Sequence, residues 1–257
     1  MSTVLLRTLC LSAAIIYYSA FTLSFLKNTV SEKASHVLWC IGITLSGAIV
    51  INNYLANGYM PFVSMYQVLT FLAVVFAPAY LYVRYMRGGG FMKKYFIATQ
   101  GVLMTGVFFM VQNSVWSFPP ALQSGYFIPH VFSYMISYSL VAIAAILCIM
   151  LPFKKNQLRQ YRRGIYDLVV TAFPFMTLGM LLGALWANSC WGHFWSWDLK
   201  EAWSLVTMLS LAVYLHFRRH NALGKYAEIF VILAFAFEII TLFFVGMFGG
   251  DSIHTYS

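Results

Sequence analysis

The chain has 257 residues, of which 61% are hydrophobic and only 9% carry a formal charge. Water-soluble domains carry about 25% charged residues, so too little polar surface is available here to coat a soluble globule. The same figures exclude intrinsic disorder, collagen-like repeats and a disulfide scaffold. We therefore expect an integral membrane protein.

Eight apolar segments are long enough to predict membrane-spanning helices, which need about 20 mostly apolar residues. In chain order they lie at about 4–26, 37–55, 65–86, 95–111, 129–151, 167–187, 202–217 and 227–247. The first segment lacks a convincing cleavage site, so we interpret it as a helix rather than a signal peptide. The pattern predicts an all-α polytopic membrane protein with a single domain over residues 1–257.

Positive charges alternate between the connectors that join these segments. Of the 16 Lys and Arg residues, 14 lie at the end of the first, third, fifth or seventh segment or in the connector after it. Because Lys and Arg are retained on the cytoplasmic side, both termini and connectors 55–64, 112–128 and 188–201 are expected on the outer side. This orientation accounts for the net charge of +9, so nucleic-acid binding is not expected.

Five of the seven tryptophans gather between residues 186 and 203, which we expect to form an outer loop. Interfacial aromatic residues explain one or two tryptophans at a loop end, but not a cluster around Gly192. Aromatic faces beside a glycine can form a flat apolar platform for a planar ligand. Asp198 and Glu201 also match a capping box, which predicts Asp198 as a helix N-cap and leaves a second role in the loop open.

Residues Trp191-Gly-His-Phe-Trp195-Ser-Trp197-Asp198 resemble the tryptophan-rich WWD motif of the haem-handling proteins of cytochrome c biogenesis. Four further segments resemble the CcsA (ResC) family of System II: Pro61–Gln67, Lys200–Trp203, Tyr214–His216 and the terminal Ile253–Tyr256. Gln67 stands where this family usually has Glu. The resemblance covers most of the chain from about residue 60 onward.

Two histidines, His130 and His254, are expected on the same outer face as the tryptophans. Two neutral imidazoles can occupy both axial positions of haem iron. The alternative is that each is an interfacial histidine bonded to water or lipid headgroups. The resemblance favours iron ligation, because CcsA-type proteins place one axial histidine before the tryptophan motif and one after it.

His216 lies near the inner end of the seventh segment. An ionisable residue close to the hydrocarbon region is a functional candidate, although a snorkelling interfacial histidine is the alternative. The resemblance implies a second haem site here, completed by a CcsB (ResB) partner. Lys200, beside the tryptophans, is a candidate for pairing with a haem propionate, a contribution of about 0–1 kcal/mol for an exposed pair.

The resemblance implies a subunit of a System II cytochrome c synthetase that carries haem b as a bound substrate. The implied haem contacts are Trp191, Gly192, Trp195, Trp197, Asp198, Lys200 and His216, with His130 and His254 on the iron. The implied partners are a CcsB-type membrane protein, an apocytochrome c with a Cys-x-x-Cys-His motif and thiol-reducing proteins. No conventional acid–base pair is expected, so any holocytochrome c synthase activity would rest on positioning thiols against haem vinyl groups.

Two other functions stay open from the sequence. One is a haem transporter or chaperone of the CcmC type, which delivers haem without attaching it. The other is a membrane b-type cytochrome, which normally needs histidine pairs inside its spanning helices. We expect a bacterial cytoplasmic membrane, with a thylakoid membrane as the alternative, and the active loop on the outer side.

Overall fold

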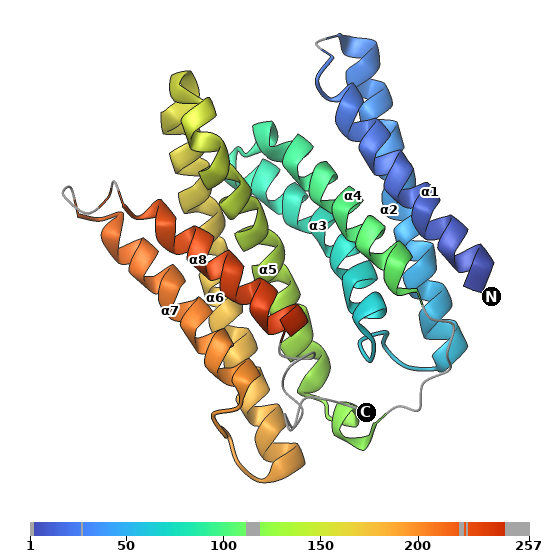
Figure 1. The fold of residues 1–257 in the computed structure, drawn as a ribbon, viewed down its shortest axis with the longest axis vertical. Coiled ribbons are helices and arrows are strands. Elements are labelled where there is room, and N and C mark those ends of the chain that lie inside the picture. The colour runs from blue at the N-terminus through green and yellow to red at the C-terminus, as the bar shows by residue number, and fades with distance from the viewer. Residues whose placement is uncertain (1–2, 27, 112–118, 221–223, 225, 245–257) are drawn as a thin grey trace. The chain divides into compact units, whose positions relative to one another are not determined.

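A computed structural model describes residues 3–26, 28–111, 119–220, 224 and 226–244 (Figure 1). Its α-helices are α1 (Thr3–Leu23), α2 (Thr29–Asn57), α3 (Met65–Arg87), α4 (Lys93–Met110), α5 (Phe127–Met150), α6 (Leu158–Trp191), α7 (Leu199–Phe217) and α8 (Glu228–Ile239). Across these described ranges there is no β-strand. The predicted all-α class is therefore confirmed.

Short helical turns join several of these elements. The 3-10 turns are η1 (Gly90–Met92), η2 (Pro120–Gln123), η3 (Leu151–Phe153) and η4 (Lys155–Gln157), and a π-helical turn, η5 (Ile240–Phe244), follows α8. The predicted ligand His254 lies outside the described residues.

The helices form two compact units, residues 1–118 and residues 119–257. In unit 1, α1 packs against α2 and α4, and α3 packs against the same two helices. In unit 2, α5 packs against α6 and α8, and α7 packs against the same two helices. All of the described tryptophan-rich segment and His130 belong to unit 2.

Five helical segments of the described chain are long and apolar enough to cross a membrane. They are Thr3–Leu23, Thr29–Asn57, Met65–Arg87, Phe127–Phe153 and Lys155–Trp191. The chain is therefore an integral membrane protein. Each of the eight predicted segments overlaps one of the helices α1 to α8, but a count of eight membrane crossings and the side of the termini stay predictions.

Two helices extend well beyond the apolar segments that predicted them. Helix α2 begins eight residues before its predicted span at 37–55, because the Asn28 side chain accepts a hydrogen bond from the Ser31 backbone at 2.6 Å and caps the helix there. Helix α6 adds polar turns at its start and runs past its predicted span at 167–187. Hydropathy identifies only the part of a helix that suits lipid, so polar helical turns outside it are missed.

Aromatic rings of unit 1 pack directly against glycines on neighbouring helices. Tyr17 of α1 is fully buried, and a methyl group added at Gly42 of α2 would lie 2.8 Å from its ring. The Tyr17 hydroxyl forms a hydrogen bond with Ser46 at 3.2 Å. Small residues let helix backbones approach closely in membrane proteins, and here the ring fills the space that a side chain would take.

Candidate functional site

His130 lies in the first turn of α5, with its ring against two glycines of α6. A methyl group added at Gly183 would lie 2.7 Å from both Cε1 and Nδ1 of the His130 ring. One helical turn earlier, a methyl group at Gly179 would lie 3.0 Å from the ring of Tyr134. We call the surface formed by Gly179 and Gly183 the glycine groove. It leaves the His130 ring no room to move toward α6.

One hydrogen bond selects the tautomer of the neutral His130 ring. Its Nδ1 lies 2.8 Å from the backbone oxygen of Gly179. A carbonyl oxygen can only accept, so Nδ1 carries a proton, and in the neutral ring the lone pair is then on Nε2. Metal-binding histidines are oriented in this way, with one ring nitrogen donating to a carbonyl and the other facing the metal. The structure therefore gives His130 the tautomer that an iron ligand needs.

Trp186 supports the other face of the His130 ring. The two ring centroids are 5.6 Å apart and their planes are 29° from parallel. Trp186 is 2% exposed, and its indole nitrogen donates to the backbone oxygen of Ala121 at 2.7 Å. Although Trp186 belongs to the tryptophan-rich segment, it is buried too deeply to offer a ligand its face. It holds His130 in place.

The tryptophan-rich segment 186–203 is not one loop, because helices enter it from both sides. Helix α6 continues through Trp191 and ends at Gly192, which has a φ of 78° and donates its backbone N–H to Asn188 at 3.0 Å. A positive φ is favourable for glycine, which explains why the helix stops there. Helix α7 begins after Asp198, so the loop comprises residues 192–198 only.

The predicted capping box at the start of α7 is confirmed. The Asp198 side chain accepts the Glu201 backbone N–H at 2.8 Å, and the Glu201 carboxylate accepts the Asp198 backbone N–H at 3.3 Å. The same carboxylate accepts the Ser196 backbone N–H at 2.8 Å. Asp198 and Glu201 therefore tie the loop to the first turn of α7, which reduces the conformational freedom of Trp195 and Trp197 in that loop.

Two loop tryptophans meet edge to face rather than forming a flat platform. The rings of Trp195 and Trp197 are 5.7 Å apart, with planes at 85°. Trp197 is 71% exposed and has a φ of 59°, which is rare for a bulky residue. The expected flat platform is not present in these two rings, because the turn through Trp197 directs them across each other.

Trp195 has an unusual polar group. Its indole N–H is buried and has no hydrogen-bond partner among the described residues. Beside it in the sequence, Phe194 is 55% exposed. A buried donor without an acceptor costs about 1–3 kcal/mol, so a bound molecule that supplied an acceptor would remove this cost. Loop 192–198 therefore combines exposed apolar rings with one donor that lacks a partner.

The other predicted site residues are spread over unit 2. Lys200 lies in the first turn of α7 and is partly buried, and Asp198 stands near its charge. His216 lies in the last turn of α7 and is exposed. His193, interpreted as a loop residue, is exposed, and its Nδ1 lies 2.9 Å from the Trp191 backbone oxygen. Since a carbonyl can only accept, Nδ1 of His193 is the donor.

Tyr66 and Gln67, from the segment that resembles the family, are both buried in unit 1. The Tyr66 hydroxyl donates to the Asn53 side chain. Gln67 forms a capping box with Ser64 at the start of α3 and accepts the Ser64 backbone N–H at 3.2 Å. Glu and Gln both serve at this position of a capping box, so the replacement of the family's usual Glu leaves the helix start intact.

Sequence reasoning missed the residues that support His130. Gly179, Gly183 and Trp186 contact the ring or its neighbour, yet none was predicted to do so. One signal was available, because glycines four residues apart in an apolar segment are typical of close helix packing in membranes. That spacing indicates a groove but not which ring fills it.

Together the fold and this site define a polytopic helical membrane protein that holds one oriented histidine in the same unit as a tryptophan-rich turn. The model of the cytochrome c assembly protein family matches residues 30–251. The chain therefore belongs to this family, in its CcsA group, and takes part in cytochrome c maturation.

Curated relatives support this assignment over most of the chain. The CcsA cytochrome c biogenesis protein of Chlamydomonas reinhardtii is 29% identical over 253 residues, which cover 91% of this chain and 71% of that protein. The Guillardia theta protein of the same name is 28% identical over 264 residues, covering 86% and 84%. That of Trieres chinensis is 28% identical over 306 residues, covering 100% and 96%.

Proposed function

We propose that this chain is the haem-presenting subunit of a System II cytochrome c synthetase. The hydrogen bond from His130 to Gly179 carries the proposal, because it leaves the lone pair on Nε2 of a ring that Trp186 and Gly183 hold in place. Cytochrome c maturation requires haem handling, and a rigid neutral imidazole is a ligand that haem iron accepts.

The residues of unit 2 suit haem as a cargo. Bound haem supplies iron for axial ligation and vinyl groups to which the two thiols of an apocytochrome c add. Trp197 and Phe194 offer exposed apolar surface for a porphyrin, while the buried Trp195 N–H offers a donor for a propionate. Because the two tryptophan rings cross at 85°, we propose that one of them meets the haem by its edge.

The remaining assignments complete this proposal. His254 is the second axial ligand, Lys200 pairs with a propionate, and Asp198 together with Gly192 shapes the loop. His216 belongs to a second haem site that a CcsB-type partner completes, which is consistent with its exposed position on α7. We place the tryptophan-rich segment on the face opposite the basic connectors, in a bacterial cytoplasmic membrane.

The chain's own part in the reaction is positioning rather than acid–base catalysis. His130 holds the iron from one side, and the capping box of Asp198 and Glu201 holds the loop. Two thiols and two vinyl groups must meet in one orientation, and fixing that orientation lowers the entropic part of the barrier. The histidine of the incoming Cys-x-x-Cys-His segment then replaces one protein ligand and allows release.

Substitution of the axial histidines tests this function. The full chain, purified in detergent with haem, should give a bis-histidine absorption spectrum. His130→Gly and His254→Gly should each lose that spectrum, and added imidazole should partly restore it by filling the vacated position. His193→Gly is the matched control, since His193 is an exposed histidine of unit 2, and it should keep the spectrum. An unchanged spectrum in both axial variants would contradict the ligand assignment.

A second experiment separates attachment from transport. The chain is reconstituted with a CcsB-type partner, haem and reduced apocytochrome c, and thioether formation is measured with and without the chain. Attachment that depends on the chain supports a synthetase subunit. If the chain delivers haem but thioether formation does not depend on it, the chain is a transporter of the CcmC type.

A further inference from the structure

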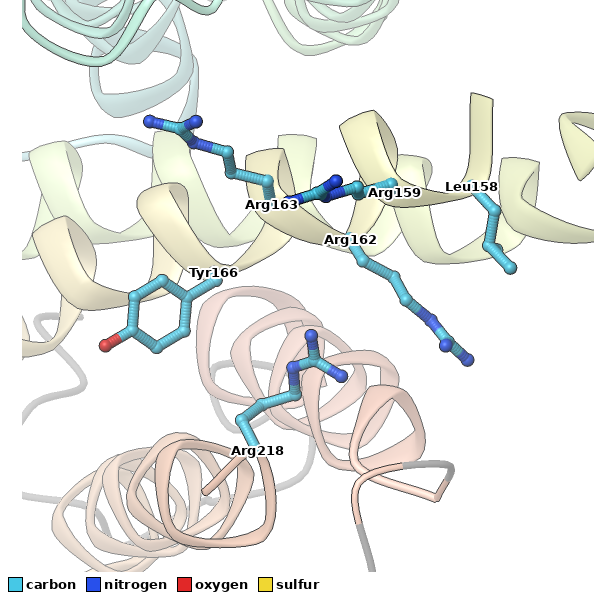
Figure 2. A pocket seen from close by; sticks show the side chains of 6 residues that line it. All are labelled: Leu158, Arg159, Arg162, Arg163, Tyr166 and Arg218. Carbon is cyan, nitrogen blue, oxygen red and sulfur yellow. The ribbon is translucent and has the colours of Figure 1, made fainter. Parts of the chain in front are cut away.

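Four arginines lie close together where α6 begins and α7 ends. This is the end of α6 opposite the tryptophan-rich segment. Together with Leu158 and Tyr166, they line a pocket of about 380 Å³ (Figure 2). The arginines are Arg159, Arg162, Arg163 and Arg218. Figure 2 shows Arg218 reaching from the end of α7 toward α6, with Tyr166 and Arg162 on either side in this view. Two helices of one unit therefore build the pocket.

The positive charge of this pocket is only partly balanced. Glu228 of α8 serves two arginines at once, with its Oε1 3.1 Å from Arg162 Nε and 3.7 Å from Arg218 Nη1. Asp167 lies 3.8 Å from Arg163 Nε. Three of the four arginines contact these two carboxylates, so the formal charge at the pocket has an excess of about two positive charges.

The arginines of the pocket also have N–H groups that can donate further hydrogen bonds. The Glu228 contacts do not have hydrogen-bond geometry, and both Arg162 Nε and Glu228 Oε1 are buried without a hydrogen-bond partner among the described residues. Each guanidinium has five N–H donors in a fork that matches the oxygens of a phosphate. An anion with several oxygens would use donors that the carboxylates do not.

The pocket wall identifies the kind of anion. Leu158 and Tyr166 are each 37% exposed, so apolar surface lies directly beside the guanidinium groups. The pocket lies in the first turns of α6, just before its apolar segment at 167–187, so we expect it near the level where headgroups meet hydrocarbon. Basic pockets between membrane helices bind phospholipid headgroups in this way.

We propose that this pocket binds the phosphate of an anionic phospholipid, with the lipid chains passing along Tyr166 and α6. This site is separate from the proposed haem-handling function and does not depend on it. Bidentate guanidinium contacts hold the phosphate, and Glu228 draws Arg162 and Arg218 toward the same carboxylate oxygen across the helices.

A lipid titration with paired variants tests the proposal. The melting temperature of the full chain in a neutral detergent is followed with dioleoyl phosphatidylglycerol, with dioleoyl phosphatidylcholine and with inorganic phosphate. Phosphatidylglycerol should raise it saturably. The pocket variant Arg159→Gln with Arg163→Gln should need about tenfold more phosphatidylglycerol for the same rise in melting temperature. This change corresponds to a loss of about 1.4 kcal/mol in binding free energy. Both side chains are exposed, so the fold should survive their replacement.

The matched control is Lys154→Gln with Lys155→Gln. It removes the same charge from the turns just before α6, outside this pocket, and its lipid requirement should stay within about twofold of the unchanged chain. The variant Arg159→Lys with Arg163→Lys keeps the charge but loses the forked donors. Its lipid requirement should lie between those of the pocket variant and the control.

Three results would overturn the assignment. If the control needs as much additional phosphatidylglycerol as the pocket variant does, surface charge alone attracts the lipid. If phosphatidylcholine raises the melting temperature as much as phosphatidylglycerol does, apolar contact dominates. Saturable stabilisation by inorganic phosphate at the same arginines would assign the pocket to a free anion.

Discussion

The two units use the same packing contact with different rings. In unit 1, Tyr17 fills the space against Gly42, and its hydroxyl ends in a hydrogen bond to Ser46. In unit 2, His130 fills the space against Gly183, and its Nδ1 ends in a hydrogen bond to Gly179. The Tyr17 hydroxyl joins α1 to α2. The neutral His130 ring joins α5 to α6 through Nδ1 and has a lone pair on its second nitrogen, Nε2. The same helix packing thus gives a purely structural contact in one unit and a potential metal ligand in the other.

The largest effect should follow from filling the groove of unit 2. Gly183→Ala places a methyl group 2.7 Å from the His130 ring, so the ring must leave its hydrogen bond to Gly179. Removing a partner that orients a metal ligand typically weakens binding about 10–100-fold. Haem retention, measured by titration of the purified chain, should fall within that range.

The control for this change is Gly47→Ala. Apart from the local helix backbone and chain neighbours, no atom of the described residues lies within 4 Å of a methyl group at Gly47, so haem retention should be unchanged. If Gly183→Ala binds haem as tightly as Gly47→Ala does, His130 does not depend on the groove.

A smaller effect is expected from the equivalent change in unit 1. Gly42→Ala forces Tyr17 to move, and overpacking costs about 1–3 kcal/mol, offset by about 1 kcal/mol of helix propensity. Thermal unfolding in detergent should show a lower melting temperature, while haem retention per folded molecule should not change. Haem loss equal to that of Gly183→Ala would remove the distinction between the units.

The smallest effect should come from Gln67 in unit 1. Gln67→Glu preserves the capping box with Ser64, so the melting temperature should change little. Gln67→Ala removes the side-chain acceptor for the Ser64 backbone and should cost about 1 kcal/mol. A large gain of function in Gln67→Glu would instead show that a carboxylate acts chemically at this position.

The parts of the fold that depend on local pattern were predictable. Apolar segments predicted helices that the structure contains, and the Asp198–Glu201 spacing predicted the capping box that starts α7. Both features depend on neighbours within a few residues, for which sequence periodicity and capping preferences suffice.

The parts that depend on packing between helices were not predictable. The hydrogen bond of His130 joins residues 49 positions apart, and it exists only because α5 lies against α6 at the glycine groove. The crossed rings of Trp195 and Trp197 depend on the positive φ of Trp197, a backbone conformation that its residue type disfavours. A tryptophan-rich sequence therefore indicates an aromatic site without giving the angle between its rings.

Helix α6 is long enough to carry the arginine pocket at its first turns and the tryptophan-rich segment at its other end. Its 34 residues extend about 51 Å at 1.5 Å per residue, while the hydrocarbon core of a bilayer is about 30 Å thick. An upright α6 would therefore project about 20 Å beyond the acyl chains. A thicker or thinner bilayer would change how much of each end is exposed to water, so the composition of the host membrane would itself set the depth of both ends.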